Sequence, residues 1–66
     1  MDMIQMVKGL TLLLKYGDGP FDAEHDEVYA GDVKHSPEQI SMLHKAQMEQ
    51  MGWSWDERFM CWKTFV

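Results

Sequence analysis

The sequence predicts one α+β domain, residues 1–66, in which two helices pack on a small antiparallel sheet of about three strands. Apolar residues recur at helical spacings of three and four in 3–16 and again in 37–51. Residues 53–66 instead carry alternating, β-branched and aromatic side chains, and residues 21–30 show a poorer alternation between turn residues. Because 66 residues suffice for one domain, these elements are expected to share a core in the order helix, strand, helix, hairpin.

The first expected helix covers residues 3–16. Its predicted buried stripe consists of Met3, Met6, Val7, Leu10, Leu13 and Leu14. Gly17 lies where a left-handed C-cap is expected, and Lys15 suits the negative end of the helix dipole. A strand over 10–16 is the alternative, since every second residue there is apolar or aromatic, and Leu12 falls off the helical stripe.

The next expected element is an edge strand over 21–30, which follows the turn residues Asp18-Gly19-Pro20. Its carboxylates lower strand propensity, but they suit an edge, where charge discourages pairing with foreign chains. Gly31-Asp32 then marks a break in the pattern.

The second helix is expected over 37–51, and it is expected to end at Gly52. Ser36 is its predicted N-cap, Pro37 suits the first helical position, and Gln39 completes a capping box. The face predicted to be apolar consists of Ile40, Leu43, His44, Gln47 and Met51.

The final segment, 53–66, predicts a hairpin that turns near Asp56-Glu57-Arg58. Cys61 and Lys63 are expected to point to one face of its second strand, and Trp62 to the other. In a chain this small, at least two of the three tryptophans are expected to belong to the core.

Charge and hydropathy exclude several classes of function. The net charge of −5 at pH 7 disfavours direct binding to nucleic acid or to an anionic membrane, because both require a basic face. The apolar run at the N-terminus is interrupted by Lys8 and Gly9, and it falls far short of the ~20 apolar residues of a membrane span. It also lacks the features of a signal peptide, so a cytoplasmic protein is expected.

No residue set in the sequence predicts catalysis. Cys61 is the single cysteine, and no histidine or asparagine near it in the sequence would activate a thiol nucleophile. Phosphate-binding glycine loops and paired metal-ligand spacings are absent. We therefore expect a protein that is not an enzyme and that carries neither a cofactor nor a metal.

The predicted binding surface is an acidic segment. Residues 18–32 hold six of the eleven carboxylates and no Lys or Arg. Carboxylates speed the encounter with a basic protein partner, and a buried aromatic anchor supplies most of the affinity. The candidate partner-binding residues are Asp22, Glu24, Asp26, Glu27, Tyr29 and Trp53.

Four sequence segments carry a resemblance. The stretch AEHDEVYAG (23–31), a helix capped by Ser-Pro-Glu, GWSWDE (52–57) and CWKTFV (61–66) together resemble small uncharacterised proteins encoded by bacteriophages and prophages. The resemblance covers residues 10–66 and implies a mobile-element origin and a role inside an infected bacterium. It implies no catalytic residues. By analogy with other small acidic phage proteins, it suggests an inhibitor of a nucleic-acid-handling host enzyme, with carboxylates in place of phosphates.

Two alternative hypotheses remain open at this point. A divalent metal could staple the chain through His25 together with His35 or His44. Alternatively, the protein could be a homo-oligomeric structural component of a phage particle, because a chain of this size gains stability from a second copy. The size of the chain is equally compatible with a homodimer and with a monomer.

Overall fold

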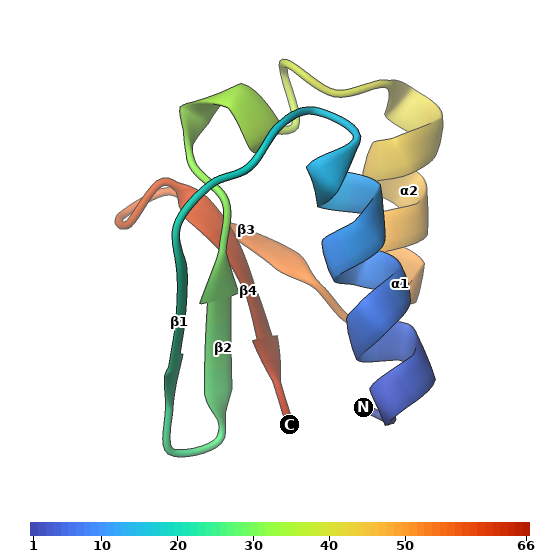
Figure 1. Cartoon of the computed structure of the whole chain (residues 1–66). Coiled ribbons are helices and arrows are strands. Elements are labelled where there is room, and N and C mark those ends of the chain that lie inside the picture. Colours follow the sequence, from blue (N-terminus) through green and yellow to red (C-terminus); the bar gives the residue numbers. More distant parts are fainter.

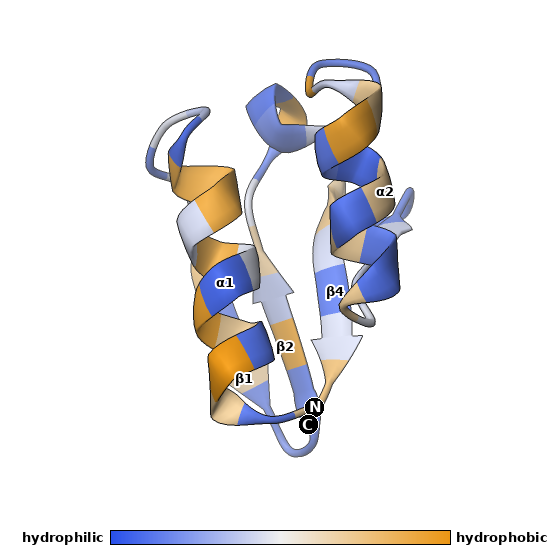
Figure 2. Ribbon diagram, turned by 90° about the vertical axis from the view of Figure 1, so that its right-hand side faces the viewer, coloured by the Kyte–Doolittle hydropathy of each residue, from blue (hydrophilic) through white to orange (hydrophobic).

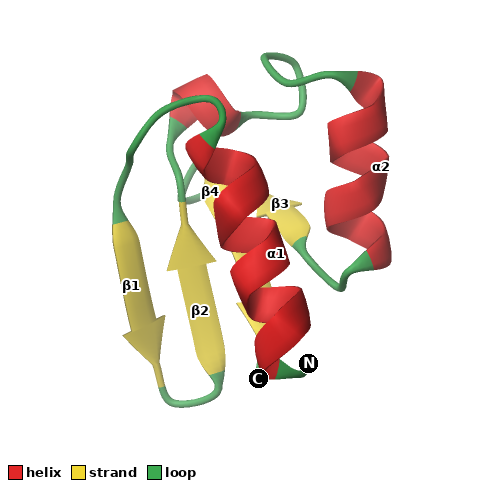
Figure 3. Cartoon of the chain, turned by 45° about the vertical axis from the view of Figure 1, so that its right-hand side comes forward, coloured by secondary structure: helices red, strands yellow, loops and turns green.

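The computed structural model describes residues 1–66 as two α-helices and one 3₁₀ turn on a four-stranded antiparallel sheet (Figure 1). The elements are α1 (Met3–Leu14), β1 (Phe21–Glu24), β2 (Glu27–Ala30), the 3₁₀ turn η1 (Val33–His35), α2 (Met42–Gln50), β3 (Ser54–Asp56) and β4 (Cys61–Phe65). The strand order is β1-β2-β4-β3, and both helices lie on one face of the sheet (Figure 3). The predicted α+β class is therefore confirmed, with four strands instead of about three.

The additional strand arises because 21–30 folds into a hairpin, whereas one continuous strand was predicted. Phe21 pairs with Ala30, and the register continues inward to a two-residue turn at His25-Asp26. His25 has a φ of 50°, a left-handed conformation that histidine adopts more readily than most residues. The segment contains none of the Asn-Gly or Asp-Gly pairs that usually indicate such a turn.

The second helix, α2, begins later than predicted. Ser36 has extended backbone angles (φ −63°, ψ 155°), and its carbonyl oxygen accepts the N–H groups of Gln39 and Ile40 in an isolated turn. Ser41 is the actual N-cap, because its hydroxyl accepts the N–H of His44 at 3.1 Å. The prediction of Ser36 as the N-cap was therefore wrong, since a second serine further along the chain caps the helix instead.

The first helix, α1, is confirmed, and Gly17 after it has the expected positive φ of 116°. Its buried face, however, differs from the predicted one. Gly9, Leu12 and Leu13 are buried, whereas Met3 is 84% exposed. The stripe was misassigned because α1 carries apolar residues along its whole length and on more than one side (Figure 2).

The core lies between the helices and the inner face of the sheet. Its buried members are Leu12, Leu13, Val28, Ala30, Ile40, Met48, Trp53 and Trp62. Trp62, on β4, is fully buried, and its indole N–H donates to the carbonyl oxygen of His35 at 2.7 Å. The predicted hairpin over 53–66 is thus confirmed and supplies two core tryptophans. Neither helix combines the length and the apolarity needed to cross a membrane.

Candidate binding face on the sheet

The outer face of the sheet, on the side away from the helices, carries Tyr29 at its centre. Val28 and Ala30 are buried on the inner face, so Tyr29 between them points outward. Directly paired residues of an antiparallel sheet share a face. Asp22 pairs with Tyr29, and Tyr29 pairs with Lys63, so these three side chains form one outward row across β1, β2 and β4.

A second outward row consists of Glu24, Glu27 and Phe65. We call the set Asp22, Glu24, Glu27 and Tyr29 the acidic outer face. None of its three carboxylates is in an ion pair, since the acidic members of the chain's ion pairs are Asp32, Glu49 and Asp56. These three carboxylates are therefore not neutralised by an ion pair within the chain, and the ammonium of Lys63 in the neighbouring row pairs with Asp56 instead.

Tyr29 is held in place by two neighbours. Its hydroxyl donates to the carboxylate of Glu27, and its ring meets the ring of Phe59 edge to face, with centroids 5.9 Å apart at 81°. The hydrogen bond to Glu27 raises the pKa of Tyr29 from its ordinary 10.0 to about 12, with burial and nearby carboxylates contributing in the same direction. The Tyr29 side chain is thus a neutral, fixed aromatic group within a negative surface.

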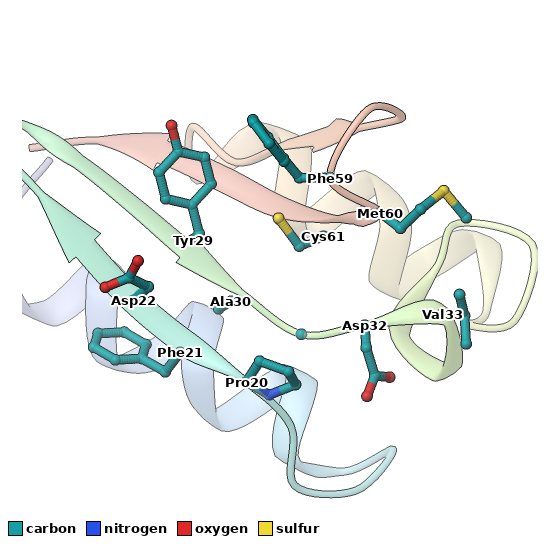
Figure 4. A pocket seen from close by; sticks show the side chains of 11 residues that line it. Pro20, Phe21, Asp22, Tyr29, Ala30, Asp32, Val33, Phe59, Met60 and Cys61 are labelled. Carbon is teal, nitrogen blue, oxygen red and sulfur yellow. The ribbon is translucent and has the colours of Figure 1, made fainter.

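A hollow of ≈ 400 Å³ opens beside this tyrosine, and it is lined by Asp22, Glu24, Tyr29, Phe59 and Cys61. Figure 4 shows Tyr29, Phe59 and Cys61 close together along one side of an adjoining hollow of ≈ 260 Å³. Burial raises the pKa of the Cys61 thiol, with a further contribution from Asp56. The thiol therefore stays protonated at neutral pH, which makes it a poor nucleophile. Aromatic walls with acids at the rim suit the side chain of a partner's lysine or arginine.

Phe59 reaches this hollow because Asp56 orders the β3–β4 loop. One carboxylate oxygen of Asp56 accepts the backbone N–H groups of Arg58 at 2.9 Å and Phe59 at 3.1 Å. The other lies 3.5 Å from the ammonium of Lys63. The amide of Phe59 is the main cause of the lowered pKa of Asp56, and the amide of Arg58 and Lys63 act in the same direction.

The structure brings together four of the six candidate binding residues, namely Asp22, Glu24, Glu27 and Tyr29. Asp26 lies beside them in the β1–β2 turn, where its carbonyl oxygen accepts the N–H of Val66 at 2.8 Å. Trp53 does not belong to this face, because it is 2% exposed and packs in the core against α1. Sequence reasoning did not identify Phe59 as part of the hollow, since its place depends on the fold of the loop.

Two of the three histidines considered as metal ligands, His35 and His44, are engaged in other contacts. Buried His35 donates from Nε2 to the carbonyl oxygen of Gly17 at 2.7 Å and accepts at Nδ1 from the N–H of Asp32 at 3.1 Å. His44 shares a hydrogen bond with the hydroxyl of Tyr16. The structure gathers no group of three His, Cys, Asp or Glu residues that could hold a metal ion. Sequence reasoning also missed the structural role of His35.

Comparison of the chain with protein-family models, with curated proteins and with solved structures finds no significant match.

The environment of Tyr29 leads to a first prediction. Tyr29 is expected to titrate at about 12, and Glu27→Gln is expected to move its pKa back toward 10.0. Because folding raises this pKa, the resulting stabilisation is fully present below pH 10.0 and is lost as the pH rises through about 12. The NMR shift of the tyrosine ring Cζ, followed against pH, measures this effect.

Two variants complete this titration experiment. Tyr29→Phe assigns the signal, because Tyr16 is the one other tyrosine of the chain. Glu49→Gln removes a carboxylate that pairs with Lys45 on α2 and should leave the titration unchanged. A Tyr29 titration midpoint near 10 in the wild type, or no change of this midpoint in Glu27→Gln, would contradict the hydrogen bond between Tyr29 and Glu27.

Proposed function

We propose that this protein is a non-enzymatic interaction module that binds a protein partner with a basic surface through its acidic outer face. The observation that carries this proposal is the set of three unpaired carboxylates, Asp22, Glu24 and Glu27, on the same sheet face as Tyr29. Unpaired like charges on one face have a repulsive cost in the free chain, and a cationic partner relieves it.

The chemistry of the face assigns different roles to its parts. Asp22 and Glu24 line the rim of the hollow, so they would steer a basic side chain toward it. Tyr29 and Phe59 form its aromatic walls, and the chain's own Arg58 guanidinium already lies over the Phe59 ring, 4.7 Å from its centroid. Tyr29 and the side of Phe59 away from Arg58 would therefore contact the apolar stem or the cationic head of that side chain. Their positions are fixed by the Glu27 hydrogen bond and by the Asp56-ordered loop, which limits the entropy lost on binding.

A sharper form of the proposal concerns the identity of the partner. Carboxylates on a rigid sheet can occupy the phosphate-binding surface of a nucleic-acid-handling enzyme and thereby inhibit it. The segment 18–32, with six carboxylates and no Lys or Arg, supports this form. We further propose that the protein acts in the cytoplasm of a bacterial host and derives from a phage or prophage.

The test begins with capture of partners from lysate of the bacterial host at low and high salt, read by mass spectrometry. Wild type is compared with Asp22→Asn/Glu24→Gln, and Glu38→Gln/Glu49→Gln serves as the matched control. Each double variant removes two charges, but the control charges lie off the outer face, in the η1–α2 connection and on α2. We expect one abundant partner that is retained by wild type and by the control, reduced in the outer-face variant and lost at high salt.

The purified partner then allows kinetic measurement. Asp22→Asn/Glu24→Gln should lower the association rate about tenfold at low salt and change the dissociation rate much less. Inhibition of the partner's activity on nucleic acid by wild type would support the inhibitor form. Binding that is independent of salt and of both outer-face charges would refute the proposed face.

A further inference from the structure

A second unpartnered surface lies on the helical side of the molecule. Four apolar side chains of α1 are exposed, namely Met3 (84%), Ile4 (65%), Val7 (60%) and Leu14 (59%). Phe21, at the start of the edge strand β1, is 58% exposed. A hollow of ≈ 180 Å³ between α1 and β1 is lined by both Leu14 and Phe21, which joins the helix to the strand. We call these five residues the α1 apolar face.

The geometry of the helix makes this face continuous. At 3.6 residues per turn, Met3, Val7 and Leu14 fall within about 40° of one another around the axis. Ile4 lies about 60° beyond Val7, with the exposed Thr11 between them. The four apolar side chains extend from the first to the last turn, over the about 18 Å length of a 12-residue helix. Leu12 and Leu13 occupy the opposite, buried side. A helix that is apolar on both sides is usually buried on both sides.

The distribution of charge indicates what could cover this face. Residues 18–66 carry ten of the eleven carboxylates and four of the six Lys and Arg residues. Residues 1–17 carry Asp2, Lys8 and Lys15, so this segment alone has a positive balance. Two copies approaching through their acidic outer faces would repel each other, and edge-to-edge pairing of β1 would bring the carboxylates of Asp22 and Glu24 of the two copies close together. The α1 apolar face is free of this repulsion.

We propose that two copies of the chain form a symmetric dimer through the α1 apolar face, with the two α1 helices antiparallel. A two-fold axis across the helices sets each patch against itself, as an isologous interface requires. The antiparallel orientation brings Lys15 of one copy to the end of the partner helix that carries Asp2. A parallel orientation would instead align both Lys8 and Lys15 with their own copies, whereas the antiparallel one leaves only Lys8, near the middle of the helix, close to its own copy.

The required area is moderate for a chain of this size. A standard stable interface buries about 800 Å² per partner, which is about one fifth of this chain's 4436 Å² of accessible surface. The proposed interface also leaves the acidic outer face open, because that face lies on the other side of the sheet. The dimer is therefore independent of the proposed partner binding, and a failure of one does not affect the other.

Sedimentation equilibrium of the full chain at increasing concentration tests the dimer. We expect Val7→Asn to weaken dimerisation about a hundredfold, because loss of a buried valine costs about tenfold and the change occurs twice in a symmetric interface. Leu43→Asn is the matched control, since Leu43 is 65% exposed on α2 and outside the patch. It should leave the association constant unchanged.

Further measurements distinguish loss of the dimer from unfolding and from binding to lipid. Far-UV circular dichroism and cooperative urea unfolding should show that monomeric Val7→Asn remains folded. Flotation with phosphatidylcholine vesicles asks whether lipid is the true occupant of the face. A monomer at about 500 μM, a dimer broken by Leu43→Asn and not by Val7→Asn, or a vesicle-bound monomer would each overturn the proposal.

Discussion

Replacing Gly9 with alanine is expected to destabilise the protein by about 2 kcal/mol. At an exposed helical position the same change stabilises by up to about 1 kcal/mol, so the expected sign is reversed. A Cβ at Gly9 would lie 2.3 Å from Nε1 and 2.8 Å from Cε2 of Trp53. Because Trp53 is 2% exposed in the core, its indole ring cannot move aside without disturbing its neighbours.

The free energy of unfolding in urea, followed by tryptophan fluorescence, measures this effect. Thr11→Ala is the matched control, because Thr11 is exposed on the same helix and its replacement should be neutral or slightly stabilising. Stabilisation by Gly9→Ala would show that Trp53 does not lie against α1. The indole N–H of Trp53 has no hydrogen-bond partner. The ring therefore contacts α1 through packing against Gly9 and not through a hydrogen bond.

Replacing His35 with alanine is expected to have an even larger effect, a loss of about 3 kcal/mol or more. The imidazole connects the carbonyl of Gly17 after α1 to the N–H of Asp32 after β2. Its removal leaves both backbone groups without this partner and opens a cavity at a site that is 1% exposed. Globular proteins have free energies of unfolding of about 0.05–0.15 kcal/mol per residue. The expected loss is therefore a large fraction of the total free energy of unfolding of a 66-residue chain.

Urea unfolding of three histidine variants measures this contribution. His35→Gln should lose less than His35→Ala, because its amide N–H can still donate toward Gly17. His25→Asn changes an exposed turn histidine to another residue that tolerates positive φ, and it should stay within about 0.5 kcal/mol of wild type. Equal, small effects for His35→Ala and His25→Asn would show that His35 does not link the two segments.

The parts of the fold that could be predicted from sequence are those set by local signals. Gly17 and Gly52 end their helices with positive φ as their positions indicated. The prediction of where α2 starts failed because Ser36 and Ser41 are both competent caps. The tertiary contact that buries Ile40, between the two serines, decides which one caps the helix. Local propensity cannot rank two such caps, since the packing of Ile40 against other segments of the chain decides between them.

The candidate site shows the same division between local pattern and tertiary contact. The acidic segment was visible in the sequence, and the alternation of a strand already separates its side chains by face. The hairpin at His25-Asp26 was not visible, yet it is what sets Asp22 opposite Tyr29 and Glu24 opposite Glu27. Exposure of Trp53 was misjudged because composition shows how many tryptophans a core needs and does not show which ones.

The strand order has a consequence for the kinetics of folding. The β1–β2 and β3–β4 hairpins each close a short loop, and such loops form within microseconds. The central β2–β4 pairing joins Ala30 to Trp62, with η1 and α2 in the intervening loop. Closing that loop costs chain entropy before any long-range contact compensates for it. We therefore expect the rate-limiting step to be the docking of two preformed hairpins, so changes at this central pairing should alter the folding rate more than changes in either hairpin turn.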